Sequence, residues 1–320
     1  MKLYNKRTIL IGLAFMSILA FWQFYDQVIP YILENVFGLN TLKANSIMAI
    51  DNVLAIFMLP LFGAISDRTH TRLGKRTPYI LYGTIAACVL MVLLALFENA
   101  VNFTGFFICL VLLLIVMSVY RSPAVAYMPD VTPKPLRSKG NAIINLVGYI
   151  GGIFATVMMM ILLRSEKAAD GTSVYTGNQS FVPIFLVIAG FMLVTVLIMV
   201  LSLNENKLLA EVHDEMEAED EELGKGEKLP KDVMVSLILV LASVFLWFTA
   251  YNAVTTAFSR YCAAIWHVDL GASSNYLLVA TVAAIAAFVP LGIHLIRQIM
   301  DSVSYERKDG RNILTITKNI

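Results

Sequence analysis

The sequence predicts an all-α, polytopic membrane protein. Of its 320 residues, 58% are hydrophobic and only 15% are charged, whereas soluble domains carry roughly a quarter charged residues. Eight apolar runs are long enough to cross a membrane, because a helix needs roughly 20 residues to span a bilayer core of about 30 Å. The net charge of +1 gives no reason to expect a nucleic-acid partner. The three cysteines show no metal-ligand spacing, so neither a metal nor a cofactor is expected.

The expected spans follow one another with polar connections between them. The first run is too long for a signal peptide, and the stretch AFWQFYDQVIP offers no small-residue cleavage site. The eight spans cover about 8–33, 44–66, 77–98, 103–128, 141–163, 181–203, 233–258 and 274–296.

Lysine and arginine set the expected orientation. If the N-terminus lies inside, nineteen of the 24 basic residues fall in cytoplasmic segments, in agreement with the positive-inside rule. Both termini are therefore predicted to be cytoplasmic, in a plasma or inner cell membrane. The whole chain divides into a six-helix bundle (1–203), an acidic cytoplasmic linker (204–232), the first two helices of a second bundle (233–296) and a polar cytoplasmic tail (297–320).

The acidic linker is expected to be a solvated helix whose Leu208, Leu209 and Val212 rest on the membrane surface. A regulatory partner site is the alternative. After the linker, the stretch FLWFTAYN (245–252) repeats features of FWQFYDQ (21–27), with a tryptophan four residues before a polar side chain in each. These features favour an internal repeat whose second copy begins at the seventh span.

A dense polar stretch, GAISDRTHTRLGKRTPYI (63–80), separates the second and third spans. It resembles the loop between helices 2 and 3 of the major facilitator superfamily. Its spacing looks like that of the sucrose–proton symporters and the wider glycoside–pentoside–hexuronide:cation symporters. The stretches YRSPAVAYMPDVTPKPLRSKGNAI (120–143) and WQFYDQVIPYILENVFGL (22–39) are similar to helix 4 and helix 1 of that group. The resemblance implies two six-helix bundles and transport by alternating access.

The polar stretch is predicted to act as a conformational latch. Gly63 permits close approach to another helix, and Asp67 can accept hydrogen bonds from Arg68 or Arg76 or lie near a helix N-terminus. The alternative is a solvated helix end whose cations are placed only by topology. The predicted latch residues are Gly63, Asp67, Arg68, Gly74, Lys75, Arg76, Asp130 and Arg137.

Three ionisable residues inside spans are the expected proton-coupling set: Asp26, Asp51 and Arg121. A charge in a lipid span costs about 2.5–3.5 kcal/mol even on the lenient insertion scale, so it should face a cavity and a partner. The resemblance implies a charge pair between helices 1 and 4. Counting along the helices instead separates Asp26 from Arg121 by roughly 13 Å of depth. For Asp51, the alternative is a simple hydrogen bond to Tyr31 or Asn52.

Aromatic and amide side chains near Asp26 suggest a sugar-binding platform, because rings stack on the pyranose face and amides bond its hydroxyls. The alternative is an interfacial aromatic belt. The predicted substrate residues are Trp22, Gln23, Tyr25 and Asn52 from the first bundle, and Trp247, Tyr251 and Asn252 from the second.

The sequence therefore predicts a secondary active transporter, with a small-molecule substrate, a sugar, carried together with a proton or sodium ion. No enzyme motif and no Walker loop is present. The bilayer is the expected partner. Because the resemblance implies twelve spans, the alternative is a truncated, non-transporting membrane protein or a fragment that needs a partner chain. By this alternative, the 320-residue chain alone accumulates no disaccharide.

Overall fold

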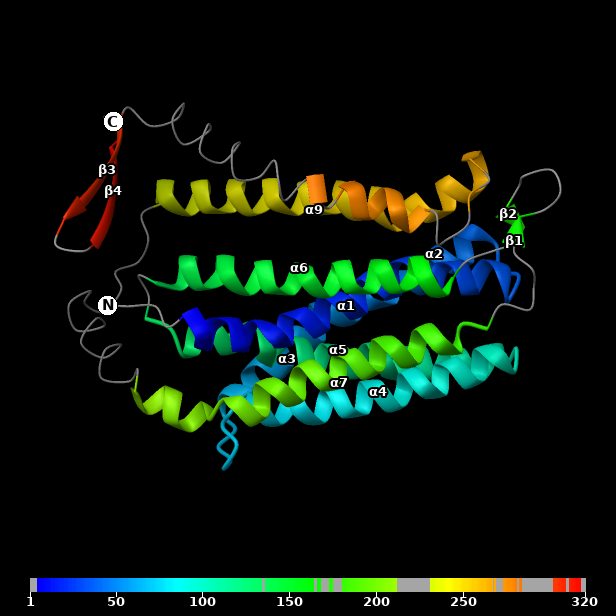
Figure 1. Cartoon of the computed structure of the whole chain (residues 1–320), viewed down its shortest axis with the longest axis horizontal. Helices are drawn as coiled ribbons and strands as arrows, with labels where there is room; N and C mark the ends of the chain where they lie inside the picture. Colours follow the sequence, from blue (N-terminus) through cyan, green and yellow to red (C-terminus); the bar gives the residue numbers. More distant parts are fainter. Residues whose placement is uncertain are drawn as a thin grey trace. The chain divides into compact units, whose positions relative to one another are not determined.

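In the computed structural model, most of the chain is helical (Figure 1). The structure describes residues 5–133, 136–163, 166–167, 173–174, 180–211, 231–266, 268, 273–280, 282–283, 302–308 and 311–317. The long helices are α1 (Asn5–Asn35), α3 (Ile50–Asp67), α4 (Thr77–Asn99), α5 (Phe103–Asp130), α6 (Arg137–Leu162), α7 (Val182–Ser202) and α9 (Lys231–Trp266), and the short helix α2 (Thr41–Met48) precedes α3. The strands are β1 (Glu166–Lys167), β2 (Ser173–Val174), β3 (Ser302–Lys308) and β4 (Arg311–Thr317).

Seven helical segments in the described residues are long and apolar enough to cross a membrane. They confirm the expected all-α polytopic class and match the first seven predicted spans closely. The second predicted span is interrupted: α2 ends at Met48, Ala49 forms a turn, and α3 starts at Ile50. For the eighth span, only residues 273–280 and 282–283 are described as helical, and residues 284–296 lie outside the described ranges.

Local sequence signals explain several helix ends. The side chain of Asn40 accepts a hydrogen bond from the backbone N–H of Lys43 and so caps α2, while Asn102 caps α5 in the same way through Gly105. Such caps satisfy backbone donors that have no partner inside the helix. A proline stands in the first turn of both α4 and α7, where its missing N–H costs nothing.

Helix α1 is the centre of the unit Met1–Ser274 and packs against α5, α6 and α7 (Figure 1). The approach of α6 is very close, because a Cβ added at Gly151 would strike the backbone carbonyl of Met16. Small residues allow this kind of contact in membranes, where backbones can then pack directly. Further contacts join α4 to α5 and α7, and α3 to α5. The shared core is aromatic and aliphatic, with Phe21, Phe24 and Phe185 almost fully buried.

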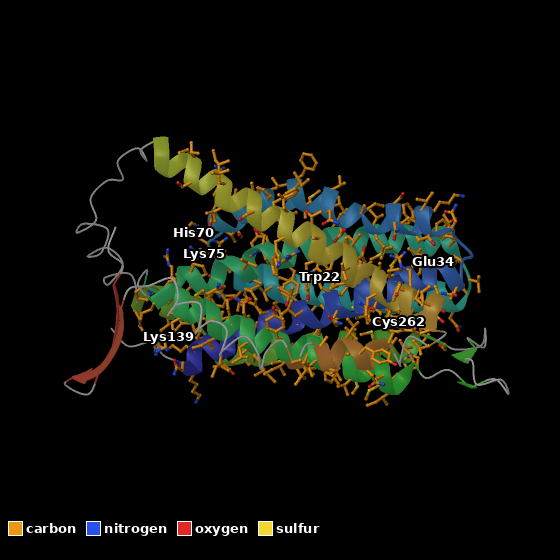
Figure 2. All side chains as sticks on the ribbon, turned by 90° about the horizontal axis from the view of Figure 1, so that it is seen from above. Trp22, Glu34, His70, Lys75, Lys139 and Cys262 are labelled. Carbon is orange, nitrogen blue, oxygen red and sulfur yellow. The ribbon has the colours of Figure 1, made fainter. Side chains whose placement is uncertain are left out.

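The unit has two ends that can be identified by labelled residues. Figure 2 shows His70, Lys75 and Lys139 toward one end, Trp22 near the middle, and Glu34 and Cys262 toward the other. We call these the Lys75 end and the Glu34 end. The distance between the two ends fits a bundle in which consecutive helices run antiparallel and each crosses the membrane once.

In the second unit, Asn275–Ile320, strands β3 and β4 pair antiparallel from Ser302↔Thr317 to Lys308↔Arg311. The sequence predicted only a polar tail here. β-branched and aromatic residues such as Val303, Tyr305 and Ile316 favour strands in these two segments.

Candidate functional site

A central charged cluster lies where α1, α3 and α5 meet. Asp26, Asp51 and Arg121 are each partly buried, and each acts electrostatically on the others. No ion pair within 4 Å joins Arg121 to either carboxylate in the described chain. With both acids ionised, the cluster carries one uncompensated negative charge. The structure therefore brings together all three residues of the predicted coupling set.

Arg121 of α5 contacts α1 by a cation–π interaction with Trp22. Its guanidinium lies over the ring of Trp22, 5.4 Å from the centroid, in an arrangement that stabilises the cation. Trp22 lies one helical turn from Asp26 on α1. Counting along the helices had argued against a direct ion pair between Asp26 and Arg121. The described residues agree with the count to this extent: Arg121 and Asp26 form no ion pair within 4 Å and interact only at longer range.

Asp51 has a local partner. One oxygen of its carboxylate accepts hydrogen bonds from the backbone N–H and the side-chain amide of Asn52, at 2.7 and 2.9 Å. This contact is one of the alternatives that the sequence left open. It accounts for one oxygen of the carboxylate and leaves its electrostatic interaction with Arg121 in place.

The aromatic side chains of α1 form a compact group. The ring of Trp22 packs edge-to-face against Tyr25, with centroids 5.3 Å apart, and Tyr25 is almost fully buried. The indole N–H of Trp22 and the hydroxyl of Tyr25 are buried without a hydrogen-bond partner among the described residues. Gln23 is partly buried on the same helix. Two buried donors beside two carboxylates make this a chemically unusual region, since buried polar groups are normally paired.

The predicted substrate residues of α9 lie on an exposed part of that helix. Trp247 and Tyr251 stack with centroids 5.7 Å apart and are 60% and 53% exposed, and Asn252 is also exposed. Tyr251 interacts electrostatically with Asp26. Nearby, the side chain of Gln27 donates a hydrogen bond to the carbonyl of Thr255 at 3.3 Å. Helix α9 therefore lies against α1 at the level of Asp26.

A second polar cluster lies at the Lys75 end. Arg76 is 3% exposed, and its guanidinium donates to the carboxylates of Asp67 and Asp130 and to the hydroxyl of Ser66. The bond to Asp130 is 2.9 Å long, and Lys75 forms an ion pair with the same carboxylate at 3.0 Å. Of the two donors expected for Asp67, Arg76 is the one that binds it. Charge-assisted bonds from one guanidinium thus join α3, α4 and α5.

The remaining predicted latch residues divide into two groups. A Cβ on Gly63 would come within 3.2 Å of the hydroxyl of Ser122, so this glycine does permit the close approach of α3 to α5. Gly74 has a φ of 116°, in the region that favours glycine. By contrast, Arg68 is exposed and Arg137 donates to the carbonyl of Thr132 at 3.2 Å. Neither contributes a described contact to the Arg76 cluster.

Glu205, which the sequence analysis did not single out, completes this cluster. Its carboxylate is fully buried and accepts bonds from the backbone N–H groups of Lys75, Arg76 and Thr77 at 2.8–3.1 Å, and from the Thr77 hydroxyl at 2.8 Å. These groups form the N-terminus of α4, where a negative charge is favoured. In the sequence, Glu205 is one of many acids in the linker, so composition alone could not identify it.

All of these contacts lie within the first bundle and the start of the linker. They fix the loop between α3 and α4 in this structure, and the latch role stays a prediction. Asp67 has a side chain that is 58% exposed, so it is the member of the cluster that another helix could reach. Within the described ranges, no group of three or more His, Cys, Asp or Glu side chains is placed to hold a metal ion.

Solved structures with a similar fold are transporters. A crystal structure of a D-xylose-proton symporter matches with a TM-score of 0.62 and 15% identity, over 92% of this chain and 69% of that chain. The xylose transporter XylE from E. coli, in a partially occluded inward-open conformation, gives 0.60 and 15% over 93% and 76%. A bacterial homologue of the human lysosomal transporter Spinster gives 0.61 and 16% over 90% and 61%. At these identities the likeness concerns the fold.

No curated protein sequence matches this chain. The family profile described as Major Facilitator Superfamily matches residues 10–308, which is most of the chain. Together with the seven apolar helices, this match makes the chain a multi-pass integral membrane protein of the transporter class rather than an enzyme. The chain belongs to the Major Facilitator Superfamily.

Proposed function

We propose that the chain is a proton-coupled sugar transporter that works by alternating access. The observation that carries the proposal is the Asp26–Asp51–Arg121 cluster beside the ring of Trp22. Ionisable groups inside membrane spans are costly and mark ion or proton pathways. Two acids with one arginine leave a single negative charge, which one cation neutralises. A proton is the coupling ion we favour, and a sodium ion is the other cation of suitable charge.

Asp26 is the proposed proton carrier. It lies on the central helix α1 and interacts with Asp51, Arg121 and Tyr251, which belong to α3, α5 and α9. When Asp26 is protonated, Arg121 balances the charge that remains on Asp51. The cluster is then neutral and can be closed off from water without burying a net charge. Protonation of Asp26 would therefore permit the change between the form open to one side of the membrane and the form open to the other.

A sugar fits the remaining chemistry of the site. Aromatic rings offer stacking surfaces, and the buried donors of Trp22 and Tyr25 can be satisfied by hydroxyl groups. The stacked pair Trp247–Tyr251 supplies a matching surface on α9. The similarity of the fold to a D-xylose-proton symporter agrees with this substrate class, and the motif resemblance of the loop 63–80 points to glycosides or disaccharides.

The test is the replacement Asp26→Asn, which keeps hydrogen bonding but cannot carry a proton. In vesicles with an imposed proton gradient, we expect the variant to lose accumulation of radiolabelled sucrose or D-xylose and to keep part of the exchange activity. Sugar binding to the purified chain, followed by tryptophan fluorescence, should persist in the variant and lose its dependence on pH. Binding is measured as well as uptake because it depends only on the site itself.

Asp51→Asn is the matched comparison, since it removes the neighbouring carboxylate. If Asp26→Asn leaves uphill uptake and the pH dependence of binding unchanged while Asp51→Asn abolishes them, Asp51 is the proton carrier. If neither sugar changes the fluorescence of the unmodified chain at any pH, the substrate class is wrong.

A further inference from the structure

Arg260 of α9 binds two different helices of the first bundle at the Glu34 end. One nitrogen of its guanidinium, Nη1, lies 3.0 Å from a carboxylate oxygen of Glu34 on α1 and 2.7 Å from the amide oxygen of Asn45 on α2. The side chains of Arg260 and Glu34 are only 14% and 19% exposed. This burial distinguishes the pair from an ordinary surface ion pair, which contributes little because water screens it.

The Glu34–Arg260 pair is one of the polar contacts between α1 and α9 in the described residues. Gln27 binds Thr255 near the level of Asp26, and Glu34 binds Arg260 further toward the Glu34 end. Both α1 and α9 therefore run in the same direction, as expected for the first helices of two repeated bundles. Figure 2 shows the corresponding end of α9, marked by Cys262, beside the end of α1 that carries Glu34.

Both halves of α9 expose large apolar side chains. Those from Met234 to Leu241 are 43–64% exposed where they are described, and Tyr261 and Ile265 are 52% and 57% exposed. Arg260 and Cys262, in the C-terminal half, are partly buried and buried. The hydrogen bonds and the ion pair that tie α9 to α1 and α2 thus lie toward its C-terminal half. In this conformer, α9 is attached to the first bundle at the Glu34 end.

We infer that Glu34, Asn45 and Arg260 form a clamp that closes the Glu34 end of the transporter and breaks when this end opens. The inference rests on the proposed alternating-access function. A partly buried pair holds the closed form, and when the helices separate both charges regain water, which offsets much of the lost attraction. Such an interaction can favour one conformer without locking it, which a two-state protein requires.

The clamp also lies close in sequence to the Asp26–Asp51–Arg121 cluster. Asn45 lies six residues before Asp51, about 9 Å along a helix, and only the turn at Ala49 separates α2 from α3. Opening the clamp releases α2, and α2 leads directly into the first turn of α3, which carries Asp51. The clamp residues are thus placed to link closure of this end to the state of the cluster.

The clamp is tested by measuring a distance across it. Spin labels are attached at Leu42 on α2 and Tyr261 on α9, which are 78% and 52% exposed, after the native cysteines are replaced by alanine. Pulsed electron spin resonance of the whole chain in lipid nanodiscs then reports the closed and open populations without any substrate.

We expect Arg260→Gln or Glu34→Gln to shift the population toward the open form, because each leaves one partly buried charge without its ionic partner in the closed form. The double variant Glu34→Gln with Arg260→Gln removes both charges and leaves none buried alone, so it should open the clamp less than either single variant. The charge swap Glu34→Arg with Arg260→Glu should restore the closed population, because Asn45 can donate to a carboxylate as well as accept from a guanidinium. Arg7→Gln, which removes the partly exposed ion pair with Glu211, is the matched control and should cause no shift.

The clamp is refuted if the single and double variants leave the distances unchanged, or if the charge swap stays as open as the single variants. These outcomes are independent of the substrate. Distances that shift as expected in a chain that binds no sugar would contradict the proposed substrate and support the clamp. Sugar uptake that survives with unchanged distances would contradict the clamp alone.

Discussion

At the scale of single residues, the loop between α3 and α4 depends on two residues that suit their positions for opposite reasons. The planar guanidinium of arginine can donate to several acceptors at once. Arg76 donates in this way to Asp67, Asp130 and Ser66. Gly74 is required because it has no side chain: its φ is 116°, and a Cβ there would overlap the carboxylate of Glu205. Both residues belong to the motif that the sequence analysis selected.

Gly74→Ala should therefore destabilise the protein. Backbone strain at such a φ costs about 1–3 kcal/mol, and the displaced Glu205 carboxylate loses bonds in addition. We expect a lower midpoint of thermal unfolding for the purified protein in detergent. Gly152→Ala in α6 is the control, since its φ is helical and a Cβ there has no neighbour within 4 Å; it should be neutral or slightly stabilising. Equal midpoints for the two variants would mean that Gly74 is not under this constraint.

At the scale of secondary-structure elements, the start of the acidic linker is part of the folded bundle. Residues 205–211 are helical, Glu205 and Leu208 are buried, and the side-chain amide of Asn206 donates to the carbonyls of Thr71 and Arg72 at 3.0 and 3.1 Å. The expectation of a solvated helix fits the exposed Asn206, Lys207 and Glu211. It is wrong for Glu205, because this buried carboxylate supplies the cap that α4 lacks in its own sequence. The rest of the linker, 212–230, lies outside the described residues.

Glu205→Gln tests the role of this cap. The amide keeps one acceptor oxygen but loses the charge, and its N–H₂ group cannot accept the bonds that the second oxygen held. A loss of about 1–3 kcal/mol in the free energy of unfolding is expected for buried groups left without partners. Hydrogen exchange should also become faster in the first turn of α4. Glu211→Gln, six residues further on and paired with Arg7 at a partly exposed site, should change both measurements much less. The role of the cap is disproved if the two variants behave alike.

At the scale of the whole molecule, the helices form a membrane-crossing bundle with two distinct ends. The loop that contains Lys75 and the start of α6 lie at one end, and Glu34 and the end of α9 lie at the other (Figure 2). The predicted latch and the proposed clamp therefore occupy opposite ends of the same bundle, with the charged cluster between them. The arrangement suits a transporter that closes one end at a time.

The orientation of this bundle is a prediction from the positive-inside rule. A single cysteine at Arg72, at the Lys75 end, should react with a membrane-impermeant maleimide only from the cytoplasmic side. A cysteine at Leu42, at the Glu34 end, should react only from outside. The topology predicted from the sequence also places Asp170 outside and Glu219 inside, and both residues lie beyond the described ranges. Labelling of both sites from the same side would overturn the predicted topology.

The sequence by itself determined the membrane-spanning helices and the residue types inside them. A run of about 20 apolar residues must form a helix in a bilayer, because every backbone polar group has to be satisfied within the segment. The same local reasoning identified Asp26, Asp51 and Arg121 as costly charges and Gly63 as a point of close approach. These are properties of one segment at a time.

Tertiary structure alone decided which of these residues meet. It placed Arg121 over Trp22, chose Arg76 as the partner of Asp67, buried Glu205 at the start of α4 and joined Arg260 to Glu34. Each of these contacts joins different helices or links residues far apart in the sequence, so no local pattern encodes it. The physical reason is that burial and proximity depend on how helices pack, and packing is set by all the helices of the bundle together.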